Sequence, residues 1–145
     1  MINGHLFTHG GLHPDLTTFE VSLEEINQIN RAHYYKPYFP SPIKNTEQLI
    51  ISNKDGICWY RGYFKGGLSQ ELVENGLAQF KAKDIIVGHS LQWKVKPLYD
   101  RKVWAIDVKH PKDYNKNFPS KSSEGLFIKQ DNYFRVLADG THETL

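Results

Sequence analysis

The chain of 145 residues has a single cysteine, Cys58. One cysteine excludes an internal disulfide, and the absence of a CxxC pair removes the usual pattern of a structural zinc site. We therefore expect a reducing compartment, which favours a cytoplasmic location. The start of the chain lacks the pattern of a signal peptide, and no run approaches the roughly 18 apolar residues that span a bilayer. We expect no membrane partner.

An excess of charge of one sign is also lacking. Lys and Arg total 18 and Asp and Glu total 16, which leaves a formal charge of +2. Nucleic-acid binding usually requires a clustered basic surface, and the lysines between 109 and 121 are explained by a solvated loop. A pI near 8.6 and many aromatic residues keep nucleic-acid binding as a weak alternative. We expect no nucleic-acid partner.

The hydrophobic content of 39% and the aromatic content of 13% suit one globular domain over residues 1–145, with an aromatic-rich core. Trp93 and Trp104 lie in strand-like segments, and we expect them in the core or at a domain interface. Three serine or asparagine residues precede stretches that predict helices. These helices follow Ser22, whose partner Glu25 completes a capping box, and then Asn45 and Ser69.

Apolar runs predict a strand at His5 to Thr8 and a strand buried on both faces at Ile85 to Val87. Polar residues from 109 to 123 predict a flexible loop. The pattern indicates a layered α+β fold, with helices first and then a mixed or antiparallel sheet. Further strands are expected at Val95–Tyr99, Val103–Val108, Leu126–Lys129 and Tyr133–Leu137.

Two histidines occupy matching positions in this pattern. His9 follows the first strand and precedes Gly10, and His89 follows the buried strand between Gly88 and Ser90. Active sites collect at the carboxyl ends of strands, and neutral imidazole binds zinc, iron and manganese. A histidine beside a strand end is also often a structural residue with a hydrogen bond. The pattern therefore leaves a metal site and a structural role open.

Arg61 lies between Tyr60 and Gly62 in the segment Trp59-Tyr60-Arg61-Gly62. A rigidly held guanidinium can bind phosphate with its planar fork. The alternative is a surface arginine whose stem packs on Trp59 or Tyr60.

Several segments resemble calcineurin-like metallophosphoesterases, in particular the bacterial and Shewanella-like protein serine/threonine phosphatases. Residues 6–14 resemble the family's "HGG" segment, residues 59–62 its "WyRG" segment, and residues 86–90 its "vGHT" segment. Residues 103–108, 124–126 and 139–140 resemble the tail of the family. The matches follow the family's order through nearly the whole chain.

The resemblance implies one half of a two-sheet sandwich that binds two metal ions (manganese, iron or zinc). By position, His9 and His89 would bind one of these ions, and Arg61 would bind the phosphate of an ester substrate. The family's Asp-x-His, Gly-Asp-x-x-Asp-Arg and Gly-Asn-His-Glu segments are missing from the sequence. These segments carry the other metal ligands, the bridging aspartate and the catalytic histidine.

We therefore interpret the chain as the C-terminal portion of a metal-dependent phosphoesterase, inactive alone and possessing no complete metal site. Half of a sandwich would expose the sheet face that the other half covers. We expect a homo-oligomer or a partner half to cover that face. The alternative is a truncated module without catalysis that binds a partner or itself.

Overall fold

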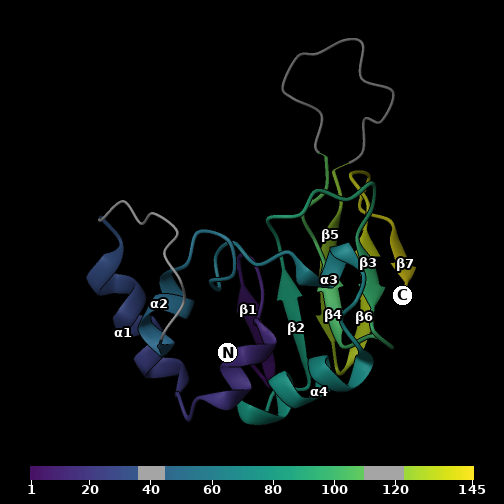
Figure 1. The fold of residues 1–145 in the computed structure, drawn as a ribbon. Coiled ribbons are helices and arrows are strands. Elements are labelled where there is room, and N and C mark those ends of the chain that lie inside the picture. Colours follow the sequence, from purple (N-terminus) through teal and green to yellow (C-terminus); the bar gives the residue numbers. More distant parts are fainter. Residues whose placement is uncertain (36–44, 110–122) are drawn as a thin grey trace.

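The first strand of the protein belongs to the same sheet as strands that lie some 80 residues later in the chain (Figure 1). The computed structural model describes residues 1–35, 45–109 and 123–145. The main sheet has the strand order β1-β2-β4-β3. Its strands are β1 (His5–Thr8), β2 (Asp84–Val87), β3 (Lys96–Leu98) and β4 (Val103–Ala105).

This main sheet is mixed. Strand β1 pairs in parallel with β2, β2 pairs in parallel with β4, and β3 runs antiparallel to β4. The parallel pairing of β1 and β2 places Thr8 opposite Val87, so both chains leave the sheet at the same edge. All four residues of β2 are buried, as the sequence predicted for a strand covered on both faces.

A second sheet forms from the end of the chain. It is an antiparallel meander in the order β5-β6-β7. Its strands are β5 (Gly125–Lys129), β6 (Asn132–Val136) and β7 (His142–Thr144). Strand β7 was not predicted, because its three residues are all exposed and carry no apolar signal.

Three of the helices begin where the sequence predicted, after Ser22, Asn45 and Ser69, whereas η1 and α3 were not predicted. The side chains of Ser22, Asn45 and Ser69 each accept a hydrogen bond from a backbone N–H in the first helical turn. Ser22 and Glu25 form the predicted capping box. The helices are η1 (Pro14–Thr18, a 3-10 helix), α1 (Leu23–His33), α2 (Thr46–Ile51), α3 (Gly62–Lys65) and α4 (Gln70–Gln79).

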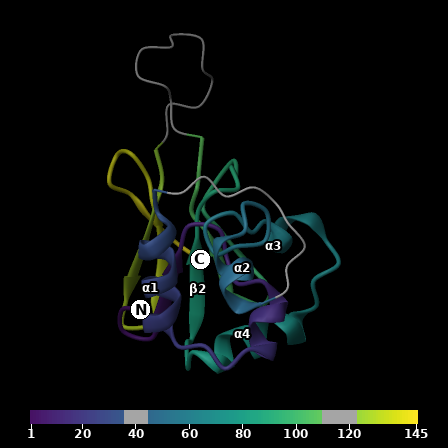
Figure 2. The same ribbon diagram turned by 60° about the vertical axis from the view of Figure 1, so that its left-hand side comes forward.

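In Figure 2 the second sheet lies on one side of β2, and helices α2 and α3 lie on the other side. Leu6, Ile85 and Val103 on one face join the core formed with the helices. Ile86 on the other face lines a cavity of about 420 Å³ with Leu126 and other residues of the second sheet. Alternation along the strands thus assigns one set of apolar side chains to each neighbouring layer.

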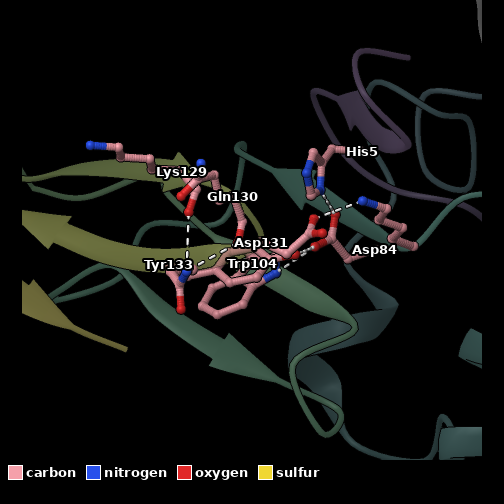
Figure 3. Close-up of polar contacts among 9 residues, drawn as sticks. His5, Asp84, Trp104, Lys129, Gln130, Asp131 and Tyr133 are labelled. Carbon is pink, nitrogen blue, oxygen red and sulfur yellow. Dashed lines mark hydrogen bonds and ion pairs between the residues drawn. The ribbon is translucent and has the colours of Figure 1, made fainter.

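A buried carboxylate joins the two sheets (Figure 3). Asp84 Oδ1 lies 2.8 Å from His5 Nδ1 on the neighbouring strand. Asp84 Oδ2 accepts hydrogen bonds from the Trp104 Nε1–H and from the Tyr133 hydroxyl of β6. The rings of Trp104 and Tyr133 also stack, with centroids 4.2 Å apart. Because Asp84 is 1% exposed, these partners replace the water that its carboxylate loses on folding.

The α+β class with mixed and antiparallel sheets is confirmed. The expected order of helices followed by strands is wrong for β1, which precedes every helix and joins the main sheet. Trp104 is in the core as predicted, whereas Trp93 is 85% exposed and is not a core residue. The predicted polar loop falls almost wholly on residues 110–122, outside the described residues. No helix in the described ranges is both long and apolar enough to cross a membrane.

Candidate functional site at the ends of strands β1 and β2

The two histidines singled out in the sequence lie side by side. His9 follows the last residue of β1, and His89 comes two residues after the end of β2. His9 Nε2 lies 3.0 Å from His89 Nδ1, and their ring centroids are 4.7 Å apart. The Gly88 N–H donates to the His9 carbonyl at 3.0 Å and keeps the two chains together beyond the sheet. The parallel register of β1 and β2 therefore creates this pair.

His89 has an unusual backbone conformation. Its φ is +60°, in the left-handed region that residues other than glycine rarely adopt. Such strained positions are concentrated at functional sites. Its Nε2 atom is buried without a hydrogen-bond partner in the described part of the chain, and so is the neighbouring Ser90 Oγ. Both features suit a residue held in place for binding.

The segment that carries Arg61 packs directly against the turn after β1. The Ile57 carbonyl accepts hydrogen bonds from the Thr8 hydroxyl and from the N–H groups of Gly10 and Gly11. A Cβ on Gly10 would lie 2.6 Å from Tyr60 N, closer than packed atoms allow. Glycine at position 10 is thus required by this close approach of two backbones.

Arg61 is an exposed residue at the start of α3, two residues after Trp59. The Trp59 ring meets the His89 ring edge to face, with centroids 5.1 Å apart and planes at 87°. Between Trp59 and Arg61, Tyr60 points into the core and is 7% exposed. Trp59 and Arg61 are therefore exposed on either side of the buried Tyr60.

The electrostatics around His89 favour its neutral form. Desolvation lowers the pKa of His89 below its ordinary value of 6.5, and the positive charge of Arg61 lowers this pKa further. The charge of His9 also lowers the pKa of His89, whereas the charge of Asp107 raises it. A neutral imidazole is the form that binds a metal ion.

The chemistry of the donor set fits a metal ion in part. Two nitrogen ligands at about 2.1 Å from one ion are about 3.4 Å apart at the tetrahedral angle usual for zinc and about 3.0 Å apart at a right angle, and the two imidazole nitrogens are 3.0 Å apart. The same distance also suits a hydrogen bond between the two rings. No group of three or more His, Cys, Asp or Glu side chains that could hold a metal lies within residues 1–35, 45–109 and 123–145. The described residues thus bring two imidazole nitrogens together without a third side chain that could complete a metal site.

The structure brings together His9 and His89, the two histidines singled out in the sequence, and the charge of Arg61 lowers the pKa of His89. Trp59 was considered merely as a packing partner of Arg61, and its contact with His89 was missed. No sequence signal connects residues 59 and 89, since the contact depends on how two loops meet at the sheet edge. His13, in the same loop as His9, instead accepts a hydrogen bond from the Asp15 N–H at 3.2 Å.

The fold and the sequence are similar to those of solved phosphatase structures. A cold-active protein tyrosine phosphatase of a psychrophilic Shewanella species superposes with a TM-score of 0.80 and 29% identity over 99% of this chain. Another structure of a cold-active protein tyrosine phosphatase gives a TM-score of 0.79 and 29% identity. The chain spans 41% and 40% of those two proteins. No family model and no curated protein matches the chain.

Proposed function

We propose that this chain carries part of a phosphatase active site that hydrolyses phosphate esters with a divalent metal ion. His9 and His89 bind one ion, and Arg61 binds the phosphate of the substrate. The observation that carries the proposal is the 3.0 Å approach of His9 Nε2 to His89 Nδ1, beside an arginine that acts on His89. The similarity to protein tyrosine phosphatases supports the reaction class.

The residues of this site have separate tasks. The lowered pKa of His89 keeps its imidazole neutral and able to donate a lone pair near pH 7. Manganese, iron or zinc held there would supply Lewis acidity toward a phosphoryl oxygen. The Arg61 guanidinium pairs with phosphate oxygens and stabilises the charge that grows on them during transfer.

We further propose that the chain derives from the calcineurin-like metallophosphoesterases. Three segments that resemble this family, residues 6–14, 59–62 and 86–90, contribute His9, Arg61 and His89. The meeting of the two histidines at one edge of the sheet, and the contact of Trp59 with His89, support the assignment. The absence of a third metal ligand from the described residues agrees with a site that another chain segment completes. We expect no turnover without that completion.

Metal binding by the purified chain tests the proposal. Calorimetric titration with Mn²⁺ should detect one site, which His9→Ala and His89→Ala both abolish. His142→Ala, at an exposed histidine of β7 in the other sheet, is the matched control and should bind as well as the unaltered chain. Inorganic phosphate should bind the metal-loaded chain and lose at least tenfold in affinity with Arg61→Ala. Metal binding that survives both histidine substitutions would overturn the proposal.

A second candidate function is a module that binds a partner or itself. Phe7 on β1 is 49% exposed, and β1 is an edge strand among the described strands. Phe7 also lines the cavity of about 420 Å³ between the sheets, together with Ile86, Ile106, Leu126 and Ile128. An open strand edge beside an apolar cavity favours association with another chain.

A further inference from the structure

The cavity of about 420 Å³ between the two sheets contains a histidine that the proposed function does not use. Small-molecule sites are cavities of about this size, apolar for the most part and furnished with a few placed polar groups. His5 supplies a polar group here, and His9 and His89 are not among the lining residues. The apolar side chains of the lining are Ile2, Phe7, Ile86, Ile106, Leu126 and Ile128.

Asp84 fixes the orientation of the His5 ring (Figure 3). Asp84 Oδ1 lies 2.8 Å from His5 Nδ1, while Oδ2 accepts from the Trp104 N–H and the Tyr133 hydroxyl. A carboxylate only accepts hydrogen bonds, so His5 donates from Nδ1 and the neutral ring keeps its lone pair on Nε2. Asp84 is therefore a positioning residue that selects one tautomer of His5.

The second ring nitrogen of His5 has no such partner. Within residues 1–35, 45–109 and 123–145, no group forms a hydrogen bond with Nε2. His5 is 6% exposed and lines the cavity, so a molecule in the cavity can reach this atom. An acceptor that loses water without gaining a donor costs free energy. A ligand that fills the cavity must therefore bring a donor to Nε2.

The surrounding charges decide the class of this ligand. Lys83 and Asp131, which also line the cavity, pair at 2.7 Å and offset each other. The Asp84 carboxylate behind His5 disfavours an anion, and the apolar lining disfavours any ion. An apolar side chain from a second copy would fill the space but leave Nε2 without a donor. A neutral hydroxyl on an apolar body meets both requirements.

We propose that the cavity between the sheets binds a small uncharged alcohol. Its hydroxyl donates to His5 Nε2, and its apolar ring or chain packs against Ile86, Ile106 and Leu126. This binding site lies outside the histidine pair: His5 begins β1, whereas His9 follows the last residue of that strand. The proposal does not depend on metal binding or on phosphate ester hydrolysis.

NMR titration of the unaltered chain with cyclohexanol and cyclohexanone tests the proposal. Their rings are the same size, but only the alcohol has a hydroxyl that donates. We expect cyclohexanol to bind about twofold to tenfold more tightly, which corresponds to one net hydrogen bond. The ¹⁵N signal of His5 Nε2 should shift with the alcohol and stay in place with the ketone. Both ligands should shift the methyl signals of Ile106 and Leu126.

A variant that fills the cavity locates the binding site. Ile106→Trp should prevent both ligands from binding, and its amide spectrum shows whether the variant remains folded. Leu91→Trp is the matched control at a residue that is 59% exposed and outside the lining, and it should bind both ligands normally.

Equal affinity for alcohol and ketone, or a preference for the ketone, would overturn the proposed hydrogen bond to Nε2. A His5 Nε2 signal that stays in place when the alcohol binds would overturn it as well. Binding that persists in a folded Ile106→Trp variant would locate the ligand elsewhere, and failure of both ligands to bind would remove the site. Each of these results leaves metal binding by His9 and His89 unaffected, so the two proposals fail separately.

Discussion

His9 Nε2 and His89 Nδ1 lie 3.0 Å apart although 80 residues separate them in the sequence. They meet because β1 and β2 are adjacent parallel strands that end at the same edge of the sheet. The carboxyl edge of parallel strands is a common location of active sites. This pair forms the centre of the candidate site. Trp59 contacts the His89 ring, and the charge of Arg61, two residues further along the same segment, lowers the pKa of His89.

The first prediction is that the chain alone has little or no catalytic activity. With Mn²⁺ and p-nitrophenyl phosphate, the purified chain should release little or no nitrophenol, because two imidazoles form an incomplete metal site. The assay should include the Arg61→Ala variant as a background. Turnover that His9→Ala or His89→Ala abolishes would contradict this prediction and assign activity to the chain by itself.

The second prediction concerns the pH response of His89. NMR titration should give a midpoint below 6.5, because burial and Arg61 lower the pKa of this imidazole. Arg61→Gln removes one positive charge and should move the midpoint upward. In the unaltered protein, the lowered pKa means that the unfolded chain binds more protons than the folded chain just below pH 6.5. The stability from neutral His89 is therefore complete above pH 6.5 and is lost as the pH falls from 6.5 toward the folded pKa.

The third prediction concerns Asp84→Asn, which tests the hydrogen bonds that link the two sheets. The buried carboxylate meets His5, Trp104 and Tyr133, so an amide leaves at least one of these groups poorly paired. We expect the free energy of unfolding to fall by about 3 kcal/mol, typical of a broken buried charge network. Urea denaturation followed by Trp fluorescence measures this change.

Asp131→Asn is the matched control for that experiment. Asp131 pairs with Lys83 at 2.7 Å, but both side chains are more than half exposed. An exposed ion pair contributes about 0–1 kcal/mol. An equal loss of stability in both variants would contradict the assigned role of Asp84.

The fourth prediction compares two glycines. Gly10→Ala places a methyl group 2.6–2.8 Å from the backbone of residues 58–60, so this variant should lose about 2 kcal/mol or more of stability. Gly76→Ala, inside α4, meets Leu12 Cδ1 at 3.8 Å, which is an ordinary contact. It should raise stability by about 0.5–1 kcal/mol through helix propensity. Thermal unfolding measures the stability of both variants. A Gly10→Ala variant as stable as the unaltered chain would contradict the close packing of these segments.

Self-association is the fifth prediction. Light scattering of the concentrated chain should show a species larger than a monomer, because the half-exposed Phe7 and the open edge of β1 favour contact with another copy. Phe7→Lys should shift the population toward the monomer. Tyr35→Lys, at a 91% exposed residue after α1, is the control and should leave the species unchanged. A clean monomer at high concentration would contradict this prediction.

Local signals in the sequence were sufficient for most elements. The caps at Ser22, Asn45 and Ser69 act within one helical turn, so the starts of α1, α2 and α4 could be read from neighbouring residues. The unbroken apolar run at Ile85 to Val87 predicted a strand with both faces covered.

The sequence by itself determined the starts of α1, α2 and α4, most strands and the choice of His9, His89 and Arg61 as candidates, because capping and alternation are short-range properties and motif order is read directly along the chain. The tertiary structure alone decided that β1 joins β2, that the two imidazoles meet and that Trp59 lies on His89. It likewise decided that Asp84 links the two sheets. These relationships depend on which elements pack together across long separations, and no local pattern encodes that choice.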